Sequence, residues 1–91
     1  MTASNLRVRI ISPQELILDT RAYSVSSKNS RGNFDILPAH ANFITIVENE
    51  PIIIRSPQQK PLTFKFPLAI ILTMENNISI YTYASPKIVL N

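Results

Sequence analysis

The sequence predicts an all-β fold, an antiparallel β-sandwich or flattened barrel of about ten short strands. Runs rich in Ile, Val, Leu, Phe and Tyr recur at intervals of roughly 8–12 residues, and none has the apolar period of a helix. Pro, Asn, Asp and Ser stand between these runs and predict turns. The length of 91 residues allows one domain, which we place at residues 1–91. Hydrophobic residues make up 45% of the chain and charged residues 16%, as expected for a globular protein.

The first strand is expected over residues 6–12, where Leu6, Val8 and Ile10 share one face. Pro13 lacks an amide hydrogen and is expected to end this strand. The other strands in the first half of the chain are expected at residues 15–18, 22–27, 33–36 and 43–47. The turns and loops between them are expected at residues 19–21, 28–32, 39–42 and 48–51.

The second half of the chain continues the same pattern. Strands are expected at residues 52–55, 62–66, 68–74 and 78–83, with a short terminal run at 87–91. Pro57, Pro61 and Pro67 interrupt the apolar runs and predict chain reversals. Glu75-Asn76-Asn77 is typical of a hairpin turn in which the asparagines take a positive φ.

Two of the expected strands are apolar on both faces. They are Ile52-Ile53-Ile54 and Leu68-Ala69-Ile70-Ile71-Leu72. An antiparallel sheet normally turns one polar face to water. Either loops and tolerated single side chains account for the excess, or another subunit covers an outer apolar patch.

The composition excludes several classes of site. A single glycine cannot form a glycine-rich phosphate loop, and the absence of cysteine excludes disulfides and thiolate metal sites. The sequence following Met1 has no signal-peptide pattern. The longest apolar run, residues 68–72, is far shorter than the roughly 20 residues that span a bilayer, so no direct membrane insertion is expected.

His40 is the only histidine and therefore the first residue to consider for catalysis. The nearest carboxylate in the sequence belongs to Asp35, and there is no second histidine or cysteine to complete a metal site. The serines lack the context of a nucleophile turn, and the other carboxylates are spread over different turns. We therefore predict no catalytic residues, no metal site and no cofactor, and a structural or interface role for His40.

A binding function is the alternative to consider. The net charge is +3, and the basic residues are scattered along the chain. Arg7 and Arg9 share a strand face, and Tyr81 and Tyr83 share another. Small β-barrels bind single-stranded nucleic acids through stacked aromatic rings beside a basic groove. A single-stranded nucleic-acid-binding barrel is therefore the alternative function.

The segment from Gly32 to Ala41 resembles the epsilon subunit of F-type ATP synthases. In that family a strand after a polar loop reads roughly Gly-x-Φ-Gly-Ile-Φ-Pro-Gly-His-Ala, where Φ is apolar. The matching residues here are Gly32, Ile36, Pro38, His40 and Ala41. Residues 6–13, which end in Ser-Pro, and residues 78–82 are similar to the first and a late strand of the family. Asp35 and Ala39 replace two family glycines, so the loop backbone is expected to take a different path there. The glycine pair usual before the penultimate strand appears as Leu68-Ala69 or its neighbours.

The resemblance implies a non-catalytic subunit of the central stalk, the rotor. Such a subunit couples the gamma subunit to the polar loops of the membrane c-ring during ATP synthesis and ion transport. It is peripheral, at the cytoplasmic face of the cell inner membrane, and binds no nucleic acid. The implied c-ring contact loop comprises Ser30, Arg31, Gly32, Asn33 and Phe34. The implied gamma contacts are His40, Ala41, Ile70 and Ile71, of the last two whichever faces outward.

The family's C-terminal helical hairpin has no counterpart in this sequence. That hairpin inhibits ATP hydrolysis and in some members binds ATP. The sequence is therefore expected to be either a truncated form or a member without this regulatory arm. Neither inhibition nor nucleotide binding is transferred to this chain.

Overall fold

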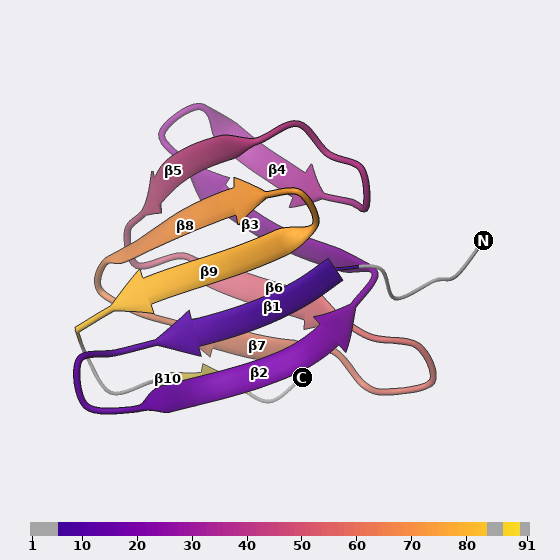
Figure 1. Ribbon diagram of the computed structural model, residues 1–91. Coiled ribbons are helices and arrows are strands. Elements are labelled where there is room, and N and C mark those ends of the chain that lie inside the picture. The colour runs from indigo at the N-terminus through magenta and orange to yellow at the C-terminus, as the bar shows by residue number, and fades with distance from the viewer. Residues whose placement is uncertain (1–5, 84–86, 90–91) are drawn as a thin grey trace.

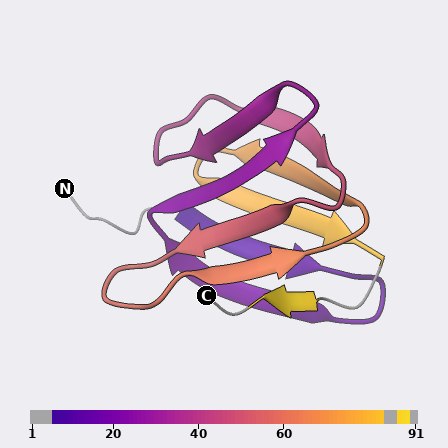
Figure 2. The same ribbon diagram turned by 180° about the vertical axis from the view of Figure 1, so that it is seen from behind.

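The protein is a two-layered β-sandwich (Figures 1 and 2). The computed structural model describes residues 6–83 and the backbone of residues 87–89. Its ten strands are β1 (Leu6–Ile11), β2 (Leu16–Ala22), β3 (Ser24–Asn29), β4 (Gly32–Ile36), β5 (Phe43–Val47), β6 (Pro51–Arg55), β7 (Leu62–Lys65), β8 (Ala69–Met74), β9 (Asn77–Thr82) and β10 (Lys87–Val89). The described residues include no helix that could cross a membrane. The predicted all-β sandwich is confirmed.

The strands form two sheets of five. Sheet A has the order β2-β1-β9-β8-β5, and sheet B has the order β10-β7-β6-β3-β4. All pairs of neighbours are antiparallel except β1 and β9, which run parallel. The sandwich is therefore antiparallel, as predicted, with the pairing of β1 and β9 as an exception. No tight turn joins β1 to β9, so hairpin geometry does not fix their relative direction.

The core lies between the two sheets and follows the alternation along each strand. Its buried side chains are Leu6, Val8, Ile10, Ala22, Val25, Ile36, Val47, Ile52, Ile54, Phe64, Phe66, Ala69, Ile71, Ile78 and Ile80. Each sheet contributes one face to this cluster. The period-two pattern of residues 6–12 thus identified the buried face of β1 correctly.

The turn predicted at residues 19–21 does not exist. Strand β2 continues through it, with Asp19 opposite Arg9 and Arg21 opposite Arg7 on β1. The polar residues are tolerated because their side chains stand on the outer face of sheet A, where charges of opposite sign on neighbouring strands attract. The chain instead bends at Tyr23, where it passes from sheet A to sheet B.

The turn between β8 and β9 forms where it was expected, with one difference. The residues with positive φ are Glu75 (49°) and Asn76 (69°), while Asn77 is already in β9. Met74 pairs with Asn77, so the turn has two residues and both need the left-handed conformation of a type I′ hairpin. The strand register thus requires a positive φ at Glu75.

Candidate interaction surfaces

An unbroken apolar row crosses the outer face of sheet A. The strand registers place Ile46 beside Ile70, Ile70 beside Tyr81, Tyr81 beside Ile11 and Ile11 beside Leu16. These five side chains come from five different strands. Outward positions of an antiparallel sheet that meets water are normally polar. A row of this kind is therefore unusual for a surface exposed to solvent.

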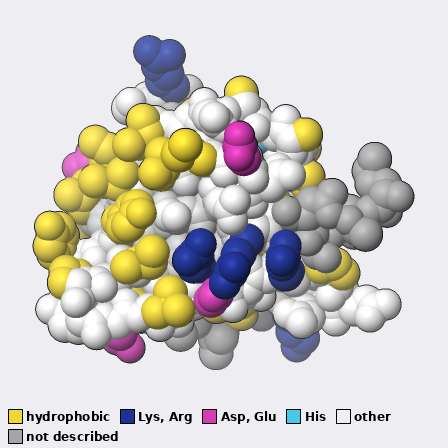
Figure 3. All heavy atoms as spheres, viewed as in Figure 1, with side chains coloured by type: hydrophobic (Ala, Val, Ile, Leu, Met, Phe, Trp, Pro, Cys, Tyr) yellow, Lys and Arg dark blue, Asp and Glu magenta, His cyan; other side chains and the backbone are white. Residues whose placement is uncertain are grey.

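The row widens over β5 and β8 into a larger apolar surface. Two residues along these strands, on the same face, Ile44 pairs with Leu72, and Met74 follows at the end of β8. Ile44 is 67% exposed and Ile46 is 55% exposed. We call the row and these neighbours the apolar patch: Ile11, Leu16, Ile44, Ile46, Ile70, Leu72, Met74 and Tyr81. Figure 3 shows apolar side chains gathered over the left of this face.

A basic corner borders the apolar patch. Arg7, Arg9 and Arg21 project from β1 and β2 on the same outer face, with Asp19 among them (Figure 3). Arg7 grips Asp19 with two hydrogen bonds, from Nε to Oδ1 at 3.1 Å and from Nη2 to Oδ2 at 2.9 Å. These bonds, with the nearby positive charges, lower the pKa of the Asp19 carboxyl. The ionised carboxylate of Asp19 is therefore already paired with Arg7.

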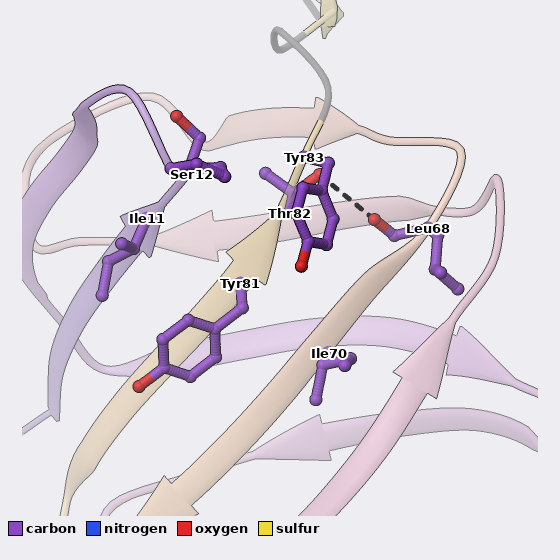
Figure 4. A pocket seen from close by; sticks show the side chains of 8 residues that line it. Ile11, Ser12, Leu68, Ile70, Tyr81, Thr82 and Tyr83 are labelled. Atoms are coloured by element: carbon purple, nitrogen blue, oxygen red, sulfur yellow. Dashed lines mark hydrogen bonds between the residues drawn. The ribbon is translucent and has the colours of Figure 1, made fainter.

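An apolar hollow lies beside the middle of the row. Its volume is about 390 Å³, and its lining includes Ile11, Pro13, Leu68, Ile70 and Tyr81. Figure 4 shows Ile11, Tyr81 and Ile70 side by side on neighbouring strands. The Thr82 hydroxyl donates to the Leu68 carbonyl at 3.1 Å, which fixes the rim beside Leu68. The hollow is open to solvent and can receive an apolar side chain.

The turn between β3 and β4 is a short, well-braced hairpin. Ser30 and Arg31 form its tip, and Gly32 follows with φ of 118°. Asn29 braces the turn, since its Oδ1 accepts the Arg31 amide at 2.9 Å and its Nδ2 donates to Thr45 at 3.0 Å on β5. The second bond ties the turn to sheet A. One hydrogen bond within the turn and one to β5 therefore hold this loop in place.

The loop from Leu37 to Asn42 begins with a tight turn. The His40 amide donates to the Leu37 carbonyl at 3.0 Å, and Ala39 has φ of 66°. Proline at the second position and a positive φ at the third fit a type II turn. Asn76 accepts the Ala39 amide at 2.7 Å, and Asn42 accepts the Glu75 amide at 3.0 Å. This loop and the β8–β9 turn are therefore bound to each other.

Comparison with known proteins assigns the family. Residues 5–84 match the model of the family described as ATP synthase, Delta/Epsilon chain, beta-sandwich domain. The chain belongs to this family. No curated protein matches the chain in a sequence search.

Solved structures show the same fold at low sequence identity. A chain from the structure of the Euglena gracilis mitochondrial ATP synthase, OSCP/F1/c-ring in rotational state 1, superposes with a TM-score of 0.84 at 11% identity. The match covers 97% of the present chain and 55% of the Euglena chain. A chain from the Tetrahymena thermophila mitochondrial ATP synthase, central stalk and c-ring, gives a TM-score of 0.70 at 11% identity, over 92% and 67% of the two chains. The present chain therefore spans about half the length of the Euglena chain.

Within this delta/epsilon sandwich, the predicted gamma contacts do not form one cluster. Ile70 is 38% exposed and lies in the apolar patch. Ile71 is fully buried against the core, so its selection as a contact is corrected: adjacent residues on a strand face opposite ways. The loop that holds His40 and Ala41 is bound to the β8–β9 turn, which follows Met74. Met74 is about 13 Å along β8 from Ile70. The His40 ring packs edge-on against Phe43 at 5.3 Å.

The predicted c-ring loop lies closer to Ile70 than His40 does. Ser30 lines a shallow hollow together with Ile44, Ile46 and Ile70. Asn33 projects from the outer side of β4, whereas Phe34 is half-buried and packs against Phe43 with ring centroids 5.7 Å apart. Phe34 therefore anchors β4 by packing inward, and little of its side chain is available to a partner.

Sequence reasoning overlooked much of the apolar patch. Ile44, Ile46 and Leu16 are among its exposed members, and none was singled out. A signal was present, because residues 43–47 are apolar on both faces, as are residues 68–72. The other two-faced run, residues 52–54, has a different explanation: its outward Ile53 is half-buried on sheet B, beside a polar cluster.

The outer face of sheet B carries that polar cluster. Arg55 donates to the Ser26 hydroxyl at 2.8 Å, and Ser26 donates to the Asp35 carboxylate. Asp35 thus takes the place of a family glycine as a hydrogen-bonded strand residue. It lies on β4, one residue before the strand ends, and not in the Leu37–Asn42 loop that holds His40. Within the described part of the chain, no three acidic or histidine side chains are grouped to hold a metal ion.

Proposed function

We propose that this domain is a central-stalk, rotor part of an F-type ATP synthase that couples the gamma subunit to the c-ring without catalysing a reaction. The exposed apolar patch on sheet A is the observation that carries the proposal. A patch crossing every strand of a sheet is far more than scattered exposed apolar residues and is typical of a subunit contact. Membership in the delta/epsilon family supports the assignment, as do the central-stalk and c-ring assemblies in which similar folds occur.

The gamma subunit binds the apolar patch in this proposal, with Ile70 near the centre of the contact. His40 and Ala41 add a second contact at the far end of β8, so gamma extends along the length of that strand. The c-ring loops meet the β3–β4 turn, chiefly Ser30, Arg31 and Asn33. The domain is peripheral, at the cytoplasmic face of the cell inner membrane.

The coupling is mechanical and depends on rigidity. A stiffer part between two partners transmits torque with less deformation of its own. The β3–β4 turn is tied to β5 by the bond from Asn29 to Thr45, and the Leu37–Asn42 loop is tied to the β8–β9 turn through Asn76. Both proposed contact loops are thus anchored to the sheet that carries the apolar patch.

Co-expression with the gamma subunit from the same source tests the proposal. A stable complex is expected to co-elute in size-exclusion chromatography. Ile70→Glu places a charge in the patch and is expected to abolish co-elution without unfolding the domain, as followed by circular dichroism. Tyr23→Glu is a matched control, because Tyr23 is also 38% exposed but lies where the chain passes between the sheets. Separate elution of the two folded wild-type proteins would refute the proposed function.

Cross-linking tests the c-ring contact independently. The chain has no cysteine, so Asn33→Cys introduces a unique thiol at the β3–β4 hairpin. In the assembled enzyme this thiol is expected to form a disulfide with a cysteine placed in the polar loop of the c subunit. Lys60→Cys, on the exposed loop between β6 and β7, is the control and should remain uncoupled. Equal yields from both positions would argue against a c-ring contact at the hairpin.

A further inference from the structure

The outer face of sheet A is divided into two zones of different chemistry. The apolar patch covers β5, β8 and the row that ends at Leu16, and the basic corner covers the remaining parts of β1 and β2. Ile11 and Arg9 are two residues apart on the same face of β1, which is about 7 Å. A partner that covers the row therefore also reaches the basic corner.

The basic corner carries unbalanced positive charge. Of the outward strand residues that the structure describes on this face, Arg7, Arg9 and Arg21 are cationic and Asp19 is anionic. Asp19 is held by Arg7 in a bidentate pair. Two positive charges are left in excess beside the patch. A purely apolar partner would strip water from these arginines without returning hydrogen bonds, which is costly.

We propose that the partner segment on this face carries an apolar stripe bordered on one side by acidic side chains. One apolar side chain of the segment fills the hollow between Pro13, Leu68 and Tyr81, and carboxylates face Arg9 and Arg21. This inference rests on the proposed function, since the gamma subunit is then the partner. If the segment is a helix, four to seven residues, or about 6–10 Å, separate the apolar anchor from the acidic side chains.

The shape of the face favours a protein segment over a lipid surface. An anionic bilayer also attracts arginines and apolar side chains, but it offers no single anchor to fill a concave hollow. Among the described strand residues on this face, the arginines lie on β1 and β2. At the β5 edge charges of both signs occur, because Arg31 lines a hollow with Ile44, and Lys28 and Glu48 line another with Ile46. The excess of positive charge is therefore one-sided, and it fixes the orientation of a partner whose negative charges are also one-sided.

Binding measurements on the wild-type complex with gamma test the charge complementarity. Arg9→Gln combined with Arg21→Gln is expected to raise the Kd by about tenfold and to reduce its dependence on salt between about 0.05 and 0.5 M. Lys60→Gln combined with Lys65→Gln removes the same charge from the sheet B side and is the control. Arg9→Glu combined with Arg21→Glu is expected to abolish binding to wild-type gamma and to bind again when the facing acidic residues of gamma are replaced by lysine. Circular dichroism checks that each variant is folded.

The outcomes separate this inference from the proposed function. If wild-type gamma does not bind, the proposed function fails and the inference fails with it. If gamma binds but the glutamine variant keeps the wild-type Kd and salt dependence, only the inference is overturned. Binding to vesicles of phosphatidylcholine and phosphatidylglycerol that the glutamine variant loses, with gamma binding unchanged, would assign the arginines to lipid and also overturn it.

Discussion

Replacing Ala39 with glycine is expected to stabilise the domain, although the substitution removes a side chain. Ala39 has φ of 66° at the third position of the Leu37–His40 turn. In this left-handed conformation the Cβ of an L-residue crowds the following carbonyl oxygen, whereas glycine has no Cβ. The loop thus keeps a backbone conformation suited to glycine, the residue that the family pattern has there, although the sequence supplies alanine.

The magnitude follows from two opposing terms. The left-handed conformation costs alanine about 1–2 kcal/mol relative to glycine. Glycine has more freedom in the unfolded chain, which costs about 0.5–1 kcal/mol on folding. The difference spans about 0–1.5 kcal/mol, so the expected net gain for Ala39→Gly is about 0.75 kcal/mol. For a domain of this size, that gain corresponds to a rise in Tm of about 3–6 °C.

Urea and thermal unfolding, followed by circular dichroism, measure this gain. Ala41→Gly is the matched control, since Ala41 lies in the same loop, is exposed and is not among the described residues with positive φ. Only the entropic term acts there, so Ala41→Gly should destabilise by about 0.5–1 kcal/mol. If the two glycine variants lose stability equally, the account of the turn is wrong.

Three further changes test other parts of the structure. Gly32→Ala is expected to lower stability by about 1–3 kcal/mol in urea unfolding although its Cβ would meet no atom within 4 Å, because φ of 118° strains any L side chain; an unchanged midpoint would contradict this. Thr73→Val is expected to raise stability by about 1 kcal/mol, since the buried Thr73 hydroxyl has no hydrogen-bond partner among the residues that the structure describes; a loss of stability would show that this hydroxyl is hydrogen-bonded in the folded protein. Because the pKa of Asp19 is lowered, its contribution to the free energy of unfolding is complete above the ordinary value of 3.8 and is lost as the pH falls through the lower folded value. Asp19→Asn should therefore flatten the acid side of the curve of stability against pH, measured between about pH 2 and pH 5. An identical curve would show that the pair with Arg7 contributes nothing.

Most strands could be predicted because local alternation and proline positions determine them. Residues 43–47 form β5 as predicted, and the two-residue turn at Glu75 and Asn76 lies within the predicted segment. The turn predicted at residues 19–21 failed for a non-local reason. Asp19 is a poor strand residue alone, but β1 supplies the arginine that pairs with it across the sheet.

The candidate site was less predictable than the fold. The run from Ala69 to Leu72 offers isoleucine on both faces, so the sequence does not distinguish Ile70 from Ile71. Only the register with Tyr81 and Ile46 shows that Ile70 belongs to a row across the sheet. The basic corner likewise depends on the pairing of β1 with β2. A surface assembled from five strands is a product of topology, and local sequence patterns record only its separate pieces.

The parallel pairing of β1 with β9 has a consequence for synthesis on the ribosome. Strands β1 and β2 can pair with each other as soon as both have emerged, but they join β8 and β5 in sheet A only through β9. Until residues 77–82 emerge, the edge of β1 that β9 later occupies is unpaired, and this early hairpin is not joined to the rest of sheet A. Such late, long-range closure makes folding slow and leaves a nascent chain exposed to aggregation. A chaperone that holds the first strands apart from other chains is therefore expected to increase the yield of folded domain.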